Sequence, residues 1–391
     1  FDALSVAENI ALGMENAPKL SELSARISAV SEAYGLPLSP DRIVGDLSAG
    51  ERQRVEIIRC LLQEPKLLIM DEPTSVLTPQ EVEILFKTLR KLSAEGTAIL
   101  YISHKLEEIR TLCDSATILR LGKVVGHCMP RETTAREMAE LMVGNLLQTP
   151  TRAAQPAGDV LLSLTELRAK APNTFGMALK DISLELRAGE ILGIAGVAGN
   201  GQSELLEVLG GYAQGTGSIW LNGDPIELTG KQSDGRSRRT RGIAHVPEDR
   251  QREGLIMDFT AWENTAFGYH HDAAYQSGLF MNNAAIKAET QAKMDRFDVR
   301  PPHPHLAARN FSGGNQQKIV LAREIERNPD LLLVGQPTRG VDIGAIEFIH
   351  QQIVALRDQG KAILLVSVEL EEILSLADRV AVMFDGQIMG E

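Results

Sequence analysis

Several features are scarce or absent in this 391-residue chain, and each absence excludes a class of protein. The three cysteines, Cys60, Cys113 and Cys128, form no CxxC pair and leave an odd number. This usage is typical of a reducing compartment and argues against a cysteine metal site. No apolar run is long enough to span a membrane, and no signal peptide opens the chain. If the protein serves transport, another polypeptide must form the pore.

Positive charge is also in deficit, because 40 Lys and Arg residues are outnumbered by 52 Asp and Glu residues, for a net charge of −12. Together with an aromatic content of only 4%, this balance argues against a general nucleic-acid binder, although it is compatible with a local basic patch. The apolar content of 43% and the charged content of 24% are ordinary for a soluble globular protein. The length predicts two or more domains.

The stretch 67–74 places four apolar residues before two adjacent carboxylates, Asp71 and Glu72. A short apolar run of this kind predicts a buried parallel strand, with the acids at its carboxyl end, where open α/β sheets place their ligands. There Asp71 would hold Mg²⁺, and Glu72 would polarise a water molecule for attack on a γ-phosphate. The alternative is a buried strand followed by an ordinary Asp-Glu-Pro turn.

Two flanking motifs favour the catalytic interpretation. Upstream, Ser48, Ala49 and Gly50 precede a helical pattern, where free backbone N–H groups can bind phosphate. Downstream, the apolar run 98–104 ends in His104, which could contact a γ-phosphate and order the attacking water. A lone histidine there would more often be structural, but the ordered set resembles the ABC-transporter ATPase family. The resemblance makes residues 48–50 the signature loop, Glu72 the catalytic glutamate of the Walker B strand, and His104 the switch histidine.

An internal repeat organises the chain. The signature-loop serines Ser48 and Ser312 lie 264 positions apart, and the same offset relates Asp71 to Gly335 and His104 to Val368. The two halves are therefore predicted to share one fold. At this offset the first phosphate loop would precede residue 1, and Glu391 would match His127. We therefore expect the chain to be truncated at both ends.

The second half contains its own phosphate-loop pattern. The buried run 190–196 leads into Gly196-Val-Ala-Gly-Asn-Gly-Gln-Ser203, followed by a helical pattern. Its glycines allow the tight turn, so that backbone N–H groups can surround phosphate, and Ser203 can approach Mg²⁺. Gln202 stands where the loop lysine belongs and supplies no positive charge. A plain glycine-rich strand–helix turn is the alternative. The resemblance assigns nucleotide contacts to Gly196, Gly199, Asn200, Gly201, Gln202 and Ser203.

The second half has lost its other catalytic side chains. Gly335 replaces the Mg²⁺ carboxylate, Gln336 the catalytic glutamate and Val368 the histidine. A complete signature loop remains, made of Ser312, Gly313, Gly314 and Asn315, and Asp342 keeps an acid after the second Walker B strand. The second set of residues is thus predicted not to hydrolyse ATP.

The resemblance implies that the halves pack head to tail. The competent ATP site would join Asp71, Glu72 and His104 to the second signature loop. The degenerate site would join the second phosphate loop to Ser48, Ala49 and Gly50. ATP and Mg²⁺ are the cofactors that this arrangement implies.

The predicted fold class is α/β, with two tandem ABC-type P-loop ATPase domains, each a mixed sheet with flanking helices and a helical subdomain. The first domain is expected at 1–144, a linker at 145–159, and the second domain at 160–391. Within the first half, we expect a helix over 79–96, two short strands over 116–126, and a closing helix over 131–143 capped by Thr133 or Thr134. Early in the second half, we expect strands over 160–167 and 177–186.

The family resemblance narrows to bacterial importers. Asp-Glu-Pro-Thr in the first half and Pro-Thr-Arg-Gly-Val-Asp in the second are similar to ribose and galactose importers. The phosphate-loop sequence, the Gln-Pro-Thr-Arg-Gly variant and the runs 245–250 and 259–264 resemble the nucleoside branch. The runs could also be a surface loop before a helix. The resemblance implies two transmembrane permease subunits, an extracytoplasmic substrate-binding protein acting indirectly, and a peripheral location on the cytoplasmic face of the bacterial membrane. The alternative is a soluble tandem ABC ATPase acting on ribosomes or DNA.

Overall fold

The computed structural model describes the chain except for residues 15, 75–76, 121, 144–157, 173–175, 231, 279 and 342. The side chains of Ala49, Pro79, Val143 and Ile343 are also outside this description. The chain forms two compact units, Phe1–Leu147 and Gln148–Glu391, and each unit is described by itself. Most of the predicted linker and Asp342 lie outside the described residues.

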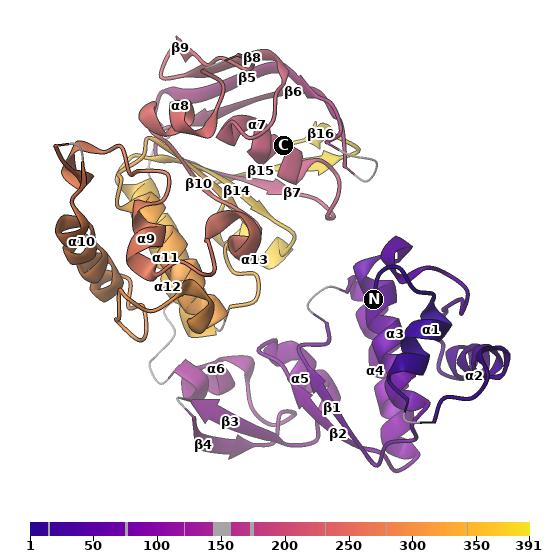
Figure 1. The fold of residues 1–391 in the computed structure, drawn as a ribbon. Coiled ribbons are helices and arrows are strands. Elements are labelled where there is room, and N and C mark those ends of the chain that lie inside the picture. The colour runs from indigo at the N-terminus through magenta and orange to yellow at the C-terminus, as the bar shows by residue number, and fades with distance from the viewer. Residues whose placement is uncertain are drawn as a thin grey trace. The chain divides into compact units, whose positions relative to one another are not determined.

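The first unit is mainly helical around two small sheets (Figure 1). Its core is built from apolar residues of the first four helices and β1. Strands β1 and β2 pair in parallel, and β3 and β4 pair antiparallel. In chain order the elements are α1 (Val6–Leu12), α2 (Leu20–Ala33), a 3-10 turn (Val44–Asp46), α3 (Ala49–Leu61), β1 (Leu67–Asp71), α4 (Pro79–Ala94), β2 (Ala98–Ile102), α5 (Leu106–Leu112), β3 (Ala116–Arg120), β4 (Lys123–Cys128) and α6 (Ala135–Val143).

Local signals in the first unit are confirmed. Helix α4 begins after Thr78, whose hydroxyl accepts a hydrogen bond from the Glu81 N–H, while Glu81 bonds back to the Thr78 N–H. Helix α6 begins after Thr134, which accepts from the Glu137 N–H, so Thr134 rather than Thr133 is the cap. Such reciprocal bonds satisfy N–H groups that a helix start leaves without partners.

The expectation of a buried β1 is wrong for half of that strand. Leu68 and Met70 are buried, but Leu67 and Ile69 are 54% and 60% exposed. The cause is the sheet: in the described residues β1 has a single strand neighbour, β2, and helices cover only one of its faces. An apolar sequence predicts a strand, but it does not show whether one face or both faces of that strand are buried.

The described part of the second unit contains two larger sheets and a small antiparallel pair, β11–β12 (Figure 1). A six-stranded sheet has the order β10–β13–β14–β7–β15–β16, parallel except for β16, and a four-stranded antiparallel sheet has the order β6–β5–β8–β9. Its strands are β5 (Val160–Ala169), β6 (Leu179–Arg187), β7 (Ile191–Ala195), β8 (Thr216–Leu221), β9 (Asp224–Pro225), β10 (Ile243–Val246), β11 (Gln276–Ser277), β12 (Phe280–Met281), β13 (Leu331–Gly335), β14 (Ala362–Ser367), β15 (Arg379–Phe384) and β16 (Gln387–Gly390). Its longer helices are α7 (Gln202–Gly210), α10 (Asn283–Arg296), α11 (Gly313–Ile325) and α12 (Ile343–Asp358), and shorter ones are α8 (Gly235–Thr240), α9 (Ala261–Ala266) and α13 (Leu370–Leu376).

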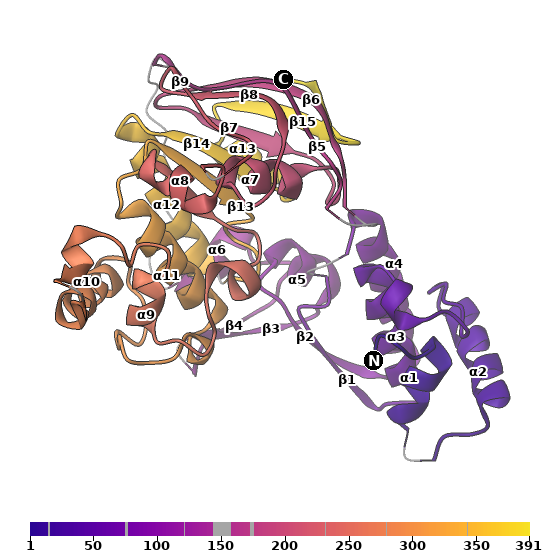
Figure 2. The same ribbon diagram turned by 45° about the horizontal axis from the view of Figure 1, so that its top comes forward.

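Both faces of the six-stranded sheet are covered (Figure 1, Figure 2). Helix α7 packs between this sheet and the four-stranded one, while α11, α12 and α13 pack on the opposite face. Strands β7, β13 and β14 are therefore buried along their whole length. Their carboxyl ends meet at one edge, and the loops leaving that edge carry the predicted phosphate loop, Gln336 and Val368. The second signature loop lies elsewhere, at the start of α11.

Candidate functional site

In the first unit, Glu72 and His104 are in direct contact. The His104 backbone N–H donates to Glu72 Oε1 at 2.9 Å, and the imidazole Nδ1 lies 2.8 Å from the same oxygen. Strands β1 and β2 end side by side, with Asp71 in register with Ile102. Glu72 and His104 follow these two ends, which brings them together. The second Glu72 oxygen, Oε2, is buried and has no hydrogen-bond partner among the described residues. The carboxylate is thus fixed through one oxygen, while its other oxygen accepts no hydrogen bond within the described residues.

The backbone at Glu72 is unusual for a residue with a side chain. Its φ is +46°, in the left-handed region, and its N–H donates to the Ile102 carbonyl at 2.9 Å. Such a conformation typically costs about 1–3 kcal/mol and gathers at functional sites. Gln336 repeats it, with φ of +47° and an N–H that donates to the Val366 carbonyl at 2.8 Å. The 264-residue offset therefore relates backbone conformation as well as sequence.

The matched side chains of the second unit make a weaker version of the same contact. Gln336 Oε1 accepts from the Val368 N–H at 3.3 Å, as Glu72 does from His104. An amide lacks the charge that makes a carboxylate a base, and valine has no ring nitrogen. Within the second unit, these two positions therefore hold no group able to activate water.

The second phosphate loop is folded around its own glutamine. Gln202 is 4% exposed, its Oε1 accepts from the Asn200 N–H at 3.2 Å, and its Nε2 donates to the Val197 carbonyl at 3.2 Å. A Cβ at Gly196 would lie 2.5 Å from that Nε2, so glycine is needed there. Gly201, with φ of +110°, precedes the first residue of α7. Gln202 thus stabilises the loop from inside.

Sequence reasoning missed a contact beside this loop. Ser203 Oγ donates to Glu248 Oε2 at 2.9 Å, and Glu248 follows strand β10. Burial raises the pKa of the Glu248 carboxyl, and the Ser203 hydrogen bond opposes that shift. The run 245–250 had been noted only for its resemblance to relatives, but its position after a strand of the same sheet could have pointed to Glu248.

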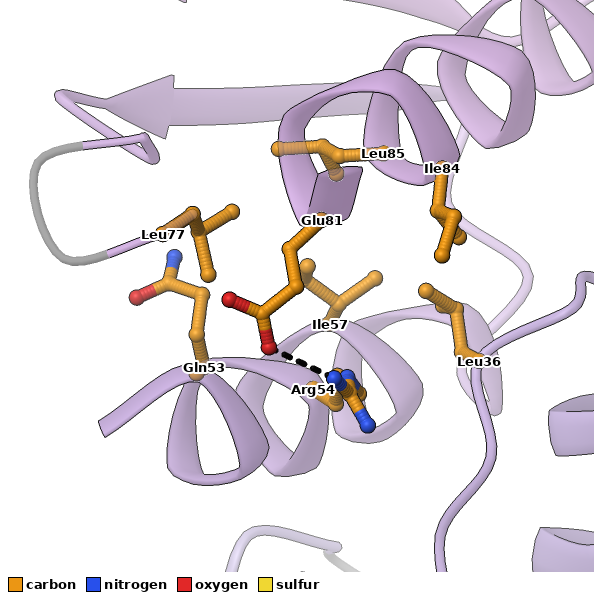
Figure 3. Close-up of a pocket in the computed structure, with 9 residues that line it drawn as sticks. Leu36, Gln53, Arg54, Ile57, Leu77, Glu81, Ile84 and Leu85 are labelled. Carbon is orange, nitrogen blue, oxygen red and sulfur yellow. Dashed lines mark hydrogen bonds and ion pairs between the residues drawn. The ribbon is translucent and has the colours of Figure 1, made fainter. Parts of the chain in front are cut away.

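The first signature loop is held by α4. Ser48 caps α3 by accepting from the Glu51 N–H. Gly50 lines a pocket between α3 and α4, where a Cβ would lie 2.5 Å from Glu81 Oε1. Figure 3 shows Arg54 reaching that carboxylate, with Nη2 2.6 Å from Oε1. A side chain at this position would have to displace the Glu81 carboxylate, and this pocket contains none of the residues predicted for hydrolysis.

The second signature loop differs in its bonding. The Ser312 hydroxyl accepts from the Asn315 side-chain amide at 2.8 Å rather than from the backbone of α11. A Cβ at Gly313 would lie 2.5 Å from Nη2 of Arg250, whose guanidinium donates to the Arg339 and Gly340 carbonyls. A positive charge therefore lies beside this loop. The pairing of either signature loop with the other half remains a prediction.

A family model described as ABC transporter matches residues 1–75 and 179–339, more than half of the chain. The chain belongs to the ABC transporter family. Members of this family are ATP-binding ATPases, and the two units are tandem ATPase domains of mixed α/β fold. The predicted identification is thus confirmed at the level of family, fold and enzyme class.

Curated relatives are similar over the whole chain. The nucleoside import ATP-binding protein NupA of Lactococcus lactis is 43% identical, covering 100% of this chain and 77% of that protein. The guanosine import ATP-binding protein NupO of Bacillus subtilis is 42% identical, covering 99% and 76%. The ribose import ATP-binding protein RbsA of Clostridium tetani is 35% identical, covering 99% and 76%.

Solved structures are similar in fold. The archaeal ribosome recycling factor aABCE1, in complex with the stalk protein aP1, matches with a TM-score of 0.62 and 20% identity, covering 99% of this chain and 71% of that one. The ATP-binding cassette MJ0796, bound to ADP and Pi, matches with a TM-score of 0.50 and 21% identity, covering 59% and 97%. At these identities the likeness shows the fold alone. No helix in the described part of the chain is long and apolar enough to cross a membrane.

Proposed function

We propose that this chain is the ATP-hydrolysing subunit of an importer for nucleosides or simple sugars, working at the cytoplasmic face of the membrane with two permease subunits. An extracytoplasmic binding protein would deliver the cargo to those subunits. Support comes from the relatives, whose names specify nucleoside, guanosine and ribose import, with the nucleoside proteins at the higher identities.

The observation that carries the hydrolytic role is the Glu72 carboxylate. His104 fixes one of its oxygens at 2.8 Å, and the other is buried without a partner in the described structure. In hydrolysis that free oxygen would accept the proton of the water attacking the γ-phosphate, while His104 holds the carboxylate in place.

Only one of the two sets of residues is proposed to be hydrolytic. The Gln336 amide repeats the Glu72 geometry without a basic oxygen, and no imidazole stands opposite it. The second set would hold nucleotide without turning it over.

The residues present fit Mg²⁺ in both units, since hydroxyl and carboxylate oxygens are its preferred ligands. Asp71 would hold it in the first unit, and Ser203 in the second, where the hydroxyl already lies 2.9 Å from a carboxylate oxygen. When bound, the metal would neutralise charge on the β- and γ-phosphates.

The proposal is tested by ATP hydrolysis of the natural full-length subunit, reconstituted with its permease subunits and binding protein. Nucleosides are added in one series, and pentoses or hexoses in another. Stimulation by nucleosides alone supports the nucleoside branch, and stimulation by sugars alone supports a sugar importer. Hydrolysis that responds to neither class would overturn the import function as stated.

A further inference from the structure

One arginine side chain joins two loops of the second unit. Arg250 donates from Nη1 to the Arg339 carbonyl at 2.6 Å and from Nη2 to the Gly340 carbonyl at 3.2 Å. A Cβ built on Gly313 would lie 2.5 Å from the same Nη2 and 2.8 Å from the Gly340 carbonyl oxygen. The guanidinium is therefore packed between the second signature loop and the loop that follows Gln336.

The next residue reaches the backbone that leads into the signature loop. Gln251 Nε2 donates to Gln316 Oε1 at 3.0 Å. The buried Gln316 amide in turn donates to the Ala308 and Phe311 carbonyls, each at 3.1 Å, and Phe311 directly precedes Ser312. Two consecutive side chains thus support the chain on both sides of Ser312.

Local structure fixes both of these side chains. Asp249 Oδ1 accepts hydrogen bonds from the Gln251 and Arg252 N–H groups at 3.0 and 3.1 Å, which caps a short π-helical turn at Arg250–Gly254. Turns of this type are rare and occur frequently at functional sites. Arg323 of α11 donates to the carbonyl of the last residue of the turn at 2.9 Å. The turn is therefore attached at two points to α11, the helix that begins at the signature loop.

The chemistry of these contacts favours arginine. A charged donor makes stronger hydrogen bonds than a neutral one, and the planar guanidinium fixes two acceptors in one geometry. Gly340, with φ of +62°, is in the left-handed region, so the loop needs glycine where its carbonyl meets Arg250. A lysine ammonium is a point donor without this fixed fork, and alanine donates nothing. Replacing Arg250 would therefore leave the two loops without their shared donor.

We propose that Arg250 is a positioning residue for ATP hydrolysis, which holds the second signature loop in the conformation that binds nucleotide. The inference rests on the proposed function and on the predicted use of this loop by the competent ATP site. It makes the turn after β10 a support of the site that hydrolyses ATP, although the hydrolytic side chains of the second unit itself are lost.

The test uses the natural full-length subunit, reconstituted with its permease subunits and binding protein, with and without cargo. Arg250→Ala is expected to lower kcat/KM for ATP about tenfold, mainly through a higher KM, because a displaced loop binds nucleotide less well while Glu72 and His104 are unchanged. Arg250→Lys should recover part of the loss. The matched control is Arg252→Ala, because this exposed side chain makes no hydrogen bond to either loop among the described residues. It should leave KM unchanged.

A double-substitution cycle separates positioning from general damage. Gly313→Ala places a Cβ against the guanidinium and should itself raise KM. If Arg250 acts through this loop, Arg250→Ala should cost much less in the Gly313→Ala protein than in the natural one, because residues in contact are not additive. Additive losses would overturn the positioning role. Tryptophan fluorescence of Trp220 and Trp262, both in the second unit, checks folding, and Arg250→Lys supplies the same comparison if Arg250→Ala unfolds.

The outcomes distinguish this inference from the proposed function. Equal KM values for Arg250→Ala and Arg252→Ala, with turnover still stimulated by cargo, would overturn the role of Arg250 and leave import intact. Turnover that responds to no cargo but shows the higher KM of Arg250→Ala would overturn import and support the role of Arg250.

Discussion

At the residue scale, the two units differ in side chains on a shared backbone. Glu72 and Gln336 have nearly the same φ and bond to the residue at the end of the adjacent strand. Only the first has a carboxylate and a partner imidazole. At these two positions, the units therefore differ in the chemistry of the side chains and agree in the backbone.

Glu72→Gln is expected to lower steady-state ATP turnover of the reconstituted protein by at least about 10²-fold, because it removes the general base. Gln336→Ala removes an amide at the matched position and is expected to leave most of the turnover. Phosphate release measures both. Comparable losses from the two substitutions would show that the assignment of one hydrolytic and one degenerate set is incorrect.

Gly50→Ala is expected to destabilise the first unit by about 1–3 kcal/mol, because the new Cβ would lie 2.5 Å from Glu81 Oε1 and overpack the site. Displacing Glu81 also disturbs its contact with Arg54. Calorimetric unfolding measures the change. Gly126→Ala is the control, since its Cβ would meet only ordinary contact with Leu141 at 3.6 Å, and an equal loss there would point to a general effect of substitution.

At the element scale, strand β10 presents a partly buried histidine to a charged cluster. His245 packs against Tyr212, with ring centroids 5.3 Å apart, and its Nε2 is buried with no hydrogen-bond partner among the residues that the structure describes. Glu324 and Arg323 of α11 and Arg239 of α8 are the charged groups facing it. Burial lowers the pKa of His245 to about 4, so the ring is neutral near pH 7.

The stability of the second unit should therefore fall as the solution is acidified from about pH 6.5 to pH 4. In that window the unfolded histidine, with a pKa near 6.5, binds a proton that the folded one does not, so acid favours the unfolded state by up to ~1.4 kcal/mol per pH unit. Urea unfolding followed by tryptophan fluorescence measures this slope. His245→Phe, which keeps an aromatic ring beside Tyr212, should flatten it, and an unchanged slope would assign it to other groups.

Sequence patterns predicted the helices and strands better than they predicted the burial of these elements and the contacts between them. The cap expected at Thr133 or Thr134, the helical pattern over 79–96 and the repeat at Ser48 and Ser312 located helices and loops, because these signals can be read directly from the sequence. The exposed face of β1 could not be predicted, since burial depends on which strands pair with it. The Ser203–Glu248 contact was missed because it joins two loops 45 residues apart through parallel strand pairing.

At the whole-molecule scale, residues related by the 264-residue repeat differ in how deeply they are buried. Leu333 on β13 is fully buried, whereas Ile69, at the corresponding position of β1, is 60% exposed. The same contrast holds for Leu331 and Leu67. Strand β13 has a strand on each side, β10 and β14, and helices on both faces of its sheet. Among the described residues, β1 pairs with β2 alone, and one of its faces is exposed.

In this 391-residue chain, Leu333→Ala is expected to destabilise the second unit by about 2–5 kcal/mol, because it leaves a cavity in a closed core. Ile69→Ala should change the stability of the first unit by no more than about 0.5 kcal/mol, as is usual for an exposed position. Calorimetry follows both units. A large loss from Ile69→Ala would mean that another surface covers the outer face of β1 in solution.

The left-handed backbone shared by Glu72 and Gln336 has a consequence for enzyme engineering. Introducing a catalytic pair into a protein usually requires the backbone to be redesigned as well. Here the backbone at Gln336 already has the φ angle found at Glu72. Installing glutamate at Gln336 and histidine at Val368 would put both groups on a frame that accommodates the same pair elsewhere in the molecule. The second unit is thus a suitable host for testing whether these two side chains are enough to confer ATP hydrolysis.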